Sequence, residues 1–282
     1  MSQKNVIHDD RRLVVDIATQ AGKILLDWRG RLARTDVSSK SAARDLVTAA
    51  DLASEEFILN SLRKAFPQDR FLAEESADES ASVEGTVWCV DPLDGTVNFV
   101  HGLPMYAVSI ARLRDGIPDL GVVHLPCLNE TFHARRGGGA WLGSRQISVS
   151  AAAKPLESLL ATGFPYRRHL LADNNLENFQ RLFLHQQGIR RMGSAATDLA
   201  YVAAGRLDGF WELHLSPWDV AAGVLLVQEA GGVADTIVSG GDCVFGGNML
   251  AGPPKLVEGM REILLEGRGA DYPNLGDNTP SA

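Results

Sequence analysis

The stretch VWCVDPLDGT at residues 87–96 joins a short apolar run to an abrupt acidic turn. Residues 87–90 are rich in strand-forming side chains, whereas residues 91–95 bring two aspartates, a proline and a glycine. Apolar runs of this kind favour a buried strand, and proline and glycine favour a turn. We therefore predict a buried strand that ends at Asp91, with polar chemistry at the strand end.

The acidic turn itself indicates a cation site. Asp91 and Asp94 flank a proline that restricts the backbone, so both carboxylates and the Leu93 carbonyl could point at one place. Oxygen ligands of this type are what Mg²⁺ prefers. A second ion would become feasible if Glu74 and Asp219 converged from other segments. Taken alone, the turn is equally well explained by a side-chain cap, and Asp219 by a helix N-cap.

Gly95 and Thr96 follow the turn directly and could begin a short helix that offers backbone N–H groups to an anion. A phosphate ester would be repelled by bare carboxylates unless bound cations reversed the local potential. The pattern thus indicates cation-dependent chemistry on a phosphate. Glu212 is a further candidate because its neighbours are apolar, although a solvent-facing strand residue is the ordinary explanation.

The remaining chain predicts a mixture of helices and strands in two halves. Residues 1–150 should form an α+β half, residues 151–266 an α/β half, and residues 267–282 a poorly ordered polar tail. In the first half we expect helices over 9–29 and 51–65, a strand at 71–72 that leads to Glu74, and hairpins within 105–150. In the second half we expect a strand over 159–162, helices over 174–184 and 195–204, and a helix over 220–230 that Asp219 caps.

Composition excludes several classes of protein. Hydrophobic residues make up 45% and charged residues 22%, as in ordinary globular proteins. A formal net charge of -8 with scattered basic residues argues against direct nucleic-acid binding. The chain has no apolar segment of about 18 residues and no signal-peptide pattern, so no membrane role is expected. Its 3 cysteines lack metal-type spacing and favour a reducing compartment, the cytosol.

Other catalytic motifs are missing from the sequence. There is no paired-histidine zinc motif, no GxSxG, no P-loop, and no GxGxxG that opens a helix after a strand. Metal-assisted hydrolysis is therefore the reaction class that the acidic residues support.

Five sequence blocks in this order resemble the inositol monophosphatase family. They are DLVTxAD at residues 45–51, FLxEES at 71–76, WxxDPLDGTxNF at 88–99, GSAAxDLA at 193–200 and WDVAAG at 218–223. The resemblance, closest to the bacterial branch of the family, implies an α/β (α+β) fold. It would be a layered α-β-α-β-α sandwich of the inositol monophosphatase and fructose-1,6-bisphosphatase type.

The resemblance also implies which residues bind the cations and which residues activate the attacking water. Two or three Mg²⁺ ions would be held by Glu74, Asp91, the Leu93 carbonyl, Asp94 and Asp219. Thr96 would orient the attacking water, with Asp51 behind it as acceptor and base, and Glu74 would share the catalytic role. Phosphate would meet the Gly95 and Thr96 amides, and the substrate's hydroxyl groups would meet Asp94, the Ala195 backbone and Glu212.

The function implied is hydrolysis of small phosphomonoesters by metal-activated water, with inositol monophosphate as the leading substrate. Lithium sensitivity and a homodimer are implied as well. The related substrates fructose 1,6-bisphosphate, histidinol phosphate and 3′-phosphoadenosine nucleotides are alternatives. Because the bacterial branch includes proteins linked to transcription antitermination, a regulatory role with such partners is a second hypothesis.

Overall fold

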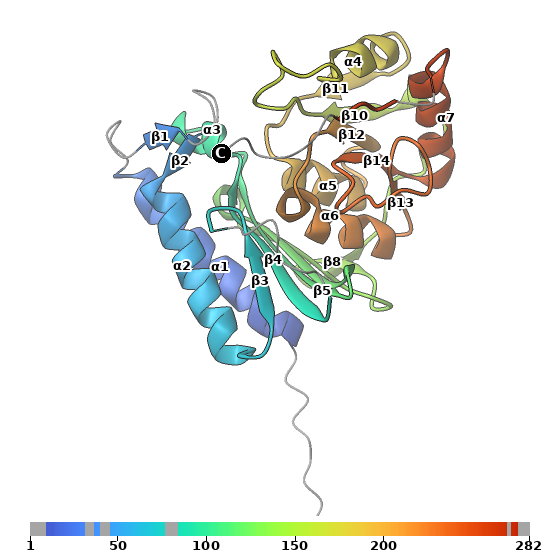
Figure 1. The fold of residues 1–282 in the computed structure, drawn as a ribbon. Helices are drawn as coiled ribbons and strands as arrows, with labels where there is room; N and C mark the ends of the chain where they lie inside the picture. Colours follow the sequence, from blue (N-terminus) through green and yellow to red (C-terminus); the bar gives the residue numbers. More distant parts are fainter. Residues whose placement is uncertain (1–9, 32–36, 40–45, 77–83, 270–271, 276–282) are drawn as a thin grey trace, which may run out of the picture.

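The computed structural model describes residues 10–31, 37–39, 46–76, 84–269 and 272–275, whose elements stack in five layers (Figure 1). Helices α1 and α2 cover one face of a seven-stranded sheet. Helices α5 and α6 lie between this sheet and a five-stranded sheet, and α4 and α7 cover the outer face of the second sheet. This order of layers confirms the predicted α-β-α-β-α sandwich.

The first layer consists of α1 (Asp10–Arg29) and α2 (Ala49–Ala65). The predicted helix over 9–29 is confirmed, and its apolar positions recur at helical spacing on the buried face. Helix α2 begins two residues earlier than predicted because Thr48 caps it: the Ala50 N–H donates to Thr48 Oγ1 over 3.1 Å. No helix within the described ranges is both long and apolar enough to cross a bilayer.

The first sheet has the strand order β3-β4-β5-β6-β7-β8-β9, in which β3 is parallel to β4 and the other pairs are antiparallel. Its strands are β3 (Arg70–Ala73), β4 (Thr86–Asp94), β5 (Ala107–Arg114), β6 (Ile117–Leu125), β7 (Glu130–Arg135), β8 (Ala140–Leu142) and β9 (Arg145–Ile147). The hairpins predicted within residues 105–150 are therefore confirmed.

Strand β4 is buried on both faces, as its continuous apolar run predicted. Val87 and Cys89 pack toward α5 and α6, whereas Trp88 and Val90 pack toward α1 and α2. The predicted strand end at Asp91 is wrong, because β4 continues to Asp94. The register against β5 shifts between Asp91 and Asp94, which accommodates the proline that lacks an N–H.

The second sheet has the order β11-β10-β12-β14-β13. Its strands are β10 (Leu159–Thr162), β11 (Gly188–Arg190), β12 (Gly209–Leu213), β13 (Val233–Asp235) and β14 (Asn248–Gly252). In β12, Phe210 packs inward toward α5 and α6, and Trp211 packs outward toward α7. Because side chains alternate along a strand, Glu212 lies on the inner face with Phe210.

The middle layer consists of α5 (Ala195–Ala203) and α6 (Pro217–Glu229). A Cβ at Gly121 of β6 would lie 3.0 Å from the Ala222 carbonyl oxygen, so glycine permits α6 to pack closely on the sheet. The predicted N-cap at Asp219 is wrong: Ser216 is the cap, Pro217 takes the first helical position, and Asp219 is the third residue of the helix.

The outer layer consists of α4 (Leu176–Phe183) and α7 (Pro254–Leu265). The sequence analysis did not predict α7. Smaller elements are α3 (Thr96–Val100), the strand pair β1 (Val37–Ser39) and β2 (Leu46–Thr48), and the 3₁₀ turns at Pro126–Leu128 and Pro155–Glu157. Residues 276–282 of the expected tail lie outside the described residues. Before them, the Tyr272 hydroxyl donates to Asn178 Oδ1 over 2.6 Å.

A buried histidine lies between α1 and the first sheet. His124 is 3% exposed, and its ring fits where Gly22 lacks a side chain, since a Cβ there would lie 2.5 Å from His124 Cδ2. Burial lowers the pKa of His124 to about 4, a backbone hydrogen bond at Glu130 raises it, and the charge of Lys23 lowers it. The folded protein therefore holds this imidazole in its neutral form.

This pKa predicts a local acid sensitivity. The unfolded chain takes up a proton on His124 below its ordinary pKa of 6.5, whereas the folded chain does so only near pH 4. The histidine's contribution to stability should therefore fall as pH drops from 6.5 to 4, by about 3 kcal/mol in total. Urea unfolding of wild type and His124→Asn at pH 7 and pH 4.5 measures it. A difference in unfolding free energy between the two proteins that is independent of pH would contradict the prediction.

Candidate active site

Four carboxylates from three segments gather between the two sheets. Glu74 follows β3, Asp91 and Asp94 close β4, and Asp219 lies in the first turn of α6. Asp91 is 1% exposed, and its pKa is raised well above the usual range, first by burial and then by the charges of the other three. A side-chain hydrogen bond joins Asp91 to Glu74. The structure thus brings together the four acidic side chains that the sequence analysis named as candidate cation ligands.

Asp94 is clasped by the start of α5. Its Oδ2 accepts hydrogen bonds from Ser194 Oγ and from the Ala196 N–H, each over 2.7 Å. Burial raises the pKa of Asp94 to about 6, against the lowering effect of these two bonds. The clasp joins residues 100 positions apart, and it links β4 to the middle layer.

Backbone N–H groups hold the other two aspartates. The Leu93 N–H donates to Asp91 Oδ1 over 2.9 Å, and the Ser216 N–H donates to Asp219 Oδ2 over 2.7 Å. Hydrogen bonds to a carboxylate stabilise its charged form, and they partly offset the repulsion among the acids. They also fix the direction in which each carboxylate points.

Thr96 and Asp51 are in contact although 45 residues separate them. The Thr96 hydroxyl lies 3.1 Å from Asp51 Oδ1 and 3.2 Å from the Leu93 carbonyl oxygen. Asp51 Oδ2 accepts from the Thr48 N–H over 2.9 Å and from the Thr48 hydroxyl. Burial raises the pKa of Asp51 to about 6, while the bonds from Thr48 lower it. Both residues are buried beside the acidic turn.

Glycine is required at the turn between Asp94 and Thr96. Gly95 has a φ of 98°, a conformation that L side chains rarely adopt, and a Cβ there would lie 3.0 Å from the Met105 carbonyl oxygen. The absence of a side chain at Gly95 therefore lets the backbone at Met105 and Gly193 pack closely against this turn.

Glu212 and Ala195 lie near Asp94. Burial raises the pKa of Glu212 to about 8, the charge of Arg191 lowers it, and Asp94 raises it. Its carboxylate packs against the Gly163 backbone, because a Cβ at Gly163 would lie 2.1 Å from Glu212 Oε1. Ala195 is the first residue of α5, directly after the clasping Ser194.

Sequence reasoning did not single out three residues of this region. Ser194 holds Asp94, Tyr166 stands 41% exposed near the four acids, and Asp198 is buried in α5. Burial and the charge of Glu212 raise the pKa of Asp198, and its Oδ1 has no hydrogen-bond partner among the described residues. An aspartate inside the apolar helix of residues 195–203 was a signal that could have found it.

The chemistry of these donors fits Mg²⁺. Carboxylate and carbonyl oxygens are hard ligands, and neither histidine nor cysteine is among them. Among the described residues, no group of three or more His, Cys, Asp or Glu side chains is arranged so that it could hold a metal ion by itself. Mg²⁺ does not need such a group, since it commonly binds one or two carboxylates and completes its shell with waters and substrate phosphate. The mutual repulsion of the buried acids is what bound cations would relieve.

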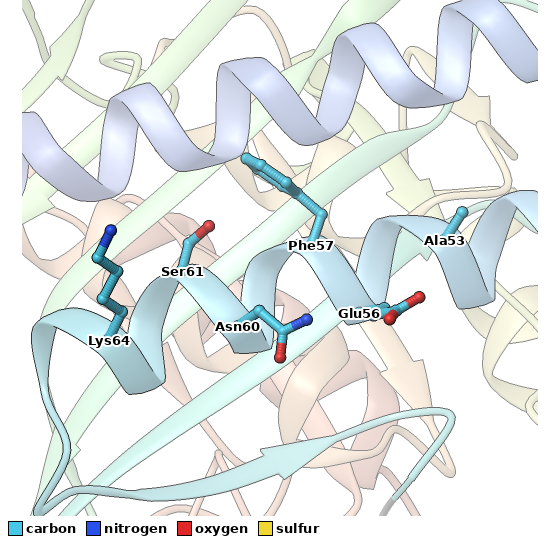
Figure 2. A pocket seen from close by; sticks show the side chains of 6 residues that line it. All are labelled: Ala53, Glu56, Phe57, Asn60, Ser61 and Lys64. Carbon is cyan, nitrogen blue, oxygen red and sulfur yellow. The ribbon is translucent and has the colours of Figure 1, made fainter.

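A surface hollow of about 370 Å³ lies elsewhere, on the outer side of α2 (Figure 2). Figure 2 shows that the side chains lining it all come from α2, with Phe57 pointing toward α1 and Asn60 pointing away from it. No buried acid of the site contributes to it. We therefore assign the chemistry to the carboxylates and not to this hollow.

Comparison with known proteins gives one consistent result. A family model described as "Inositol monophosphatase family" matches residues 8–266. The Escherichia coli (strain K12) protein named Nus factor SuhB is 40% identical over 254 residues, 90% of this chain and 95% of that protein. Inositol-1-monophosphatase of Mesorhizobium japonicum is 41% identical over 240 residues, 85% and 90% of the two chains. The solved inositol monophosphatase of Anabaena sp. PCC 7120 has a TM-score of 0.80 at 38% identity, covering 91% of this chain and 95% of that chain.

The repulsion among the acids predicts an unusual stability change. In a chelator, Asp94→Asn should melt no lower than wild type, because the amide oxygen can still accept from Ser194 and Ala196 while one negative charge is removed. Added Mg²⁺ should then stabilise wild type by about 2–3 kcal/mol at a hundredfold excess over Kd, and the variant by clearly less. Circular dichroism melts with chelator and with Mg²⁺ measure both effects. Equal stabilisation of the two proteins by Mg²⁺ would exclude Asp94 as a cation ligand.

Proposed function

The chain belongs to the inositol monophosphatase family, and from this membership and the cluster of carboxylates we propose that it is a Mg²⁺-dependent phosphatase of small phosphomonoesters. Inositol monophosphate is the leading substrate. The observation that supports the proposal most strongly is the convergence of Glu74, Asp91, Asp94 and Asp219, because the charges of the other three carboxylates raise the pKa of buried Asp91.

The proposed cation ligands are Glu74, Asp91, the Leu93 carbonyl, Asp94 and Asp219. Two or three bound Mg²⁺ ions would supply Lewis-acid chemistry: they lower the pKa of water from its bulk value of about 15.7 and neutralise charge that develops on the phosphate. The ions would also turn a site that repels phosphate into one that attracts it.

The chain's own contribution to the chemistry is orientation and proton transfer. The Thr96 hydroxyl, held by Asp51 Oδ1, is placed to orient the attacking water. As the water oxygen bonds to phosphorus and the ester P–O bond breaks, Thr96 passes the water's proton toward Asp51, and the leaving alkoxide takes a proton from solvent. With its pKa raised to about 6, Asp51 is suited to act as the base near neutral pH. Glu74 would assist from the cation site.

Substrate recognition is assigned to groups on both sides of Asp94. The Gly95 and Thr96 amides would contact phosphate oxygens. The hydroxyl groups of a polyol would form hydrogen bonds with Asp94, the backbone at Ala195 and Glu212. Buried carboxyl groups that hydrogen-bond hydroxyls discriminate strongly against substrates that lack them. This favours a polyol phosphate over the related esters.

A second function is a regulatory role with transcription antitermination proteins. The observation in its favour is that relatives named Nus factor SuhB and inositol-1-monophosphatase match this chain at similar identity, 40% and 41%.

We expect a homodimer in either role, for which the exposed Leu170 and Leu184 are candidate contacts. The free thiols of Cys89, Cys127 and Cys243 support a cytosolic location. Direct contact with nucleic acid or membrane is not proposed.

The first prediction from the proposed function tests the phosphatase activity itself. Inositol 1-phosphate, fructose 1,6-bisphosphate, histidinol phosphate and a 3′-phosphoadenosine nucleotide are ranked by kcat/KM with Mg²⁺, and we expect inositol phosphate to rank first. Asp94→Asn should lower kcat by about 100-fold or more, because it removes charge stabilisation of the transition state. Asp27→Asn, the same change on the exposed side of α1, should leave kcat unchanged. Full activity of Asp94→Asn at saturating Mg²⁺ would refute the assignment.

The second prediction tests the proton relay. Thr96→Ala and Asp51→Asn should each lower kcat, and the double variant should be little slower than the worse single variant, because residues that act as a unit lose most of their function at the first change. Mg²⁺ affinity of Thr96→Ala, measured by calorimetry, should change little. Rate losses that multiply, or Mg²⁺ binding that disappears in Thr96→Ala, would show that the relay is wrong.

A further inference from the structure

Asn98 connects the acidic turn to a distant loop by its side-chain amide. Its Nδ2 donates to the Met105 carbonyl over 2.6 Å and to the Met192 carbonyl over 2.8 Å. The side chain is 9% exposed. Both N–H bonds of the amide are used, and both acceptors are main-chain oxygens whose positions are thereby fixed. Asn98 therefore fixes two main-chain segments. A hydrogen bond to another side chain could instead be lost when that side chain rotates.

The two carbonyls belong to segments that enclose Gly95. A Cβ at Gly95 would lie 3.0 Å from the Met105 oxygen and 3.2 Å from the Gly193 oxygen. Gly193 also has a positive φ of 88°, and a Cβ there would lie 2.8 Å from Asn98 Nδ2. Two glycines thus permit the acidic turn, the loop before β5 and the loop before α5 to pack backbone to backbone.

The contacts form a closed ring between the two halves of the chain. Asp94 is tied to Ser194, and four residues further on Asn98 is tied to Met192, two residues before Ser194. The segment 94–98 is therefore fastened to the segment 192–194 at both ends. If one of these two hydrogen bonds were lost, the other would remain as a single link. Ser194 could then move relative to Asp94.

We infer that Asn98 is a positioning residue that holds the Met192–Ser194 segment against the acidic turn and so keeps Ser194 and the Ala196 N–H on Asp94. It touches no reacting atom and acts through the loop before α5. A side chain that only fills space would contribute to stability but not to the orientation of Asp94. The kinetic part of this inference rests on the proposed phosphatase function, whereas the structural part does not.

The structural arm of the test is made in a chelator, without substrate or metal. Hydrogen exchange at the Ala196 amide should become about tenfold faster or more in Asn98→Ala, because the bond to Asp94 opens more often, while amides of α7 are unchanged. Val257→Ala, on the buried face of α7, controls for a general loss of stability and should leave Ala196 exchange unchanged. Unchanged Ala196 exchange in Asn98→Ala would overturn the inference, whether or not the protein is a phosphatase.

The kinetic arm asks whether the same residue affects turnover. Asn98→Ala should lower kcat about tenfold or more with a smaller change in KM, since a small misplacement near the reacting groups is costly. Ser194→Ala should have a similar effect, and the two losses should not multiply in the double variant. If Asn98→Ala does not fold, Asn98→Ser keeps one donor, and an intermediate change in both exchange and kcat is expected. Wild-type kcat in folded Asn98→Ala, or fully multiplicative losses, would overturn the inference. Absence of activity in wild type would instead reject the proposed function.

Discussion

Repulsion among buried like charges is the constraint on which the rest of this structure depends. Asp91 is 1% exposed, and the charges of Glu74, Asp94 and Asp219 raise its pKa; Asp94 and Glu74 likewise raise the pKa of Asp219. Such a group of charges works against folding. The protein opposes it with backbone N–H and hydroxyl donors to oxygens of the three aspartates, which orient these carboxylates before any cation binds.

Three helices from two layers also stabilise the carboxylates. Asp51 lies in the first turn of α2, Asp219 lies in the first turn of α6, and Asp94 accepts from the Ala196 N–H in the first turn of α5. The N-terminal end of a helix carries a partial positive charge and unsatisfied N–H groups, and both favour nearby anions. The layered fold thus directs three helix starts at one acidic region. Close packing at Gly121 keeps the middle layer near enough to the first sheet for this to work.

Asp94 shows how one residue links stability and function. It belongs to the acidic turn of β4, yet its best hydrogen bonds come from α5. The two halves of the chain therefore meet at a residue proposed as a cation ligand, and the geometry of the site depends on how the halves are held together. Relatives with an enzymatic name and relatives with a regulatory name share this fold, and the fold alone does not decide between the two roles.

Local sequence determined the elements and the identity of the acidic residues. The continuous apolar run of β4 and the helical spacing of α1 are properties of neighbouring residues, and they were predicted for that reason. The N-cap of α6 was mispredicted even though Ser216 before Pro217 is a local signal. The contact of Thr96 with Asp51 and the clasp of Ser194 on Asp94 join residues 45 and 100 positions apart. Only the packing of the layers decides such contacts, because a hydrogen bond between distant segments depends on where the whole chain places their backbones.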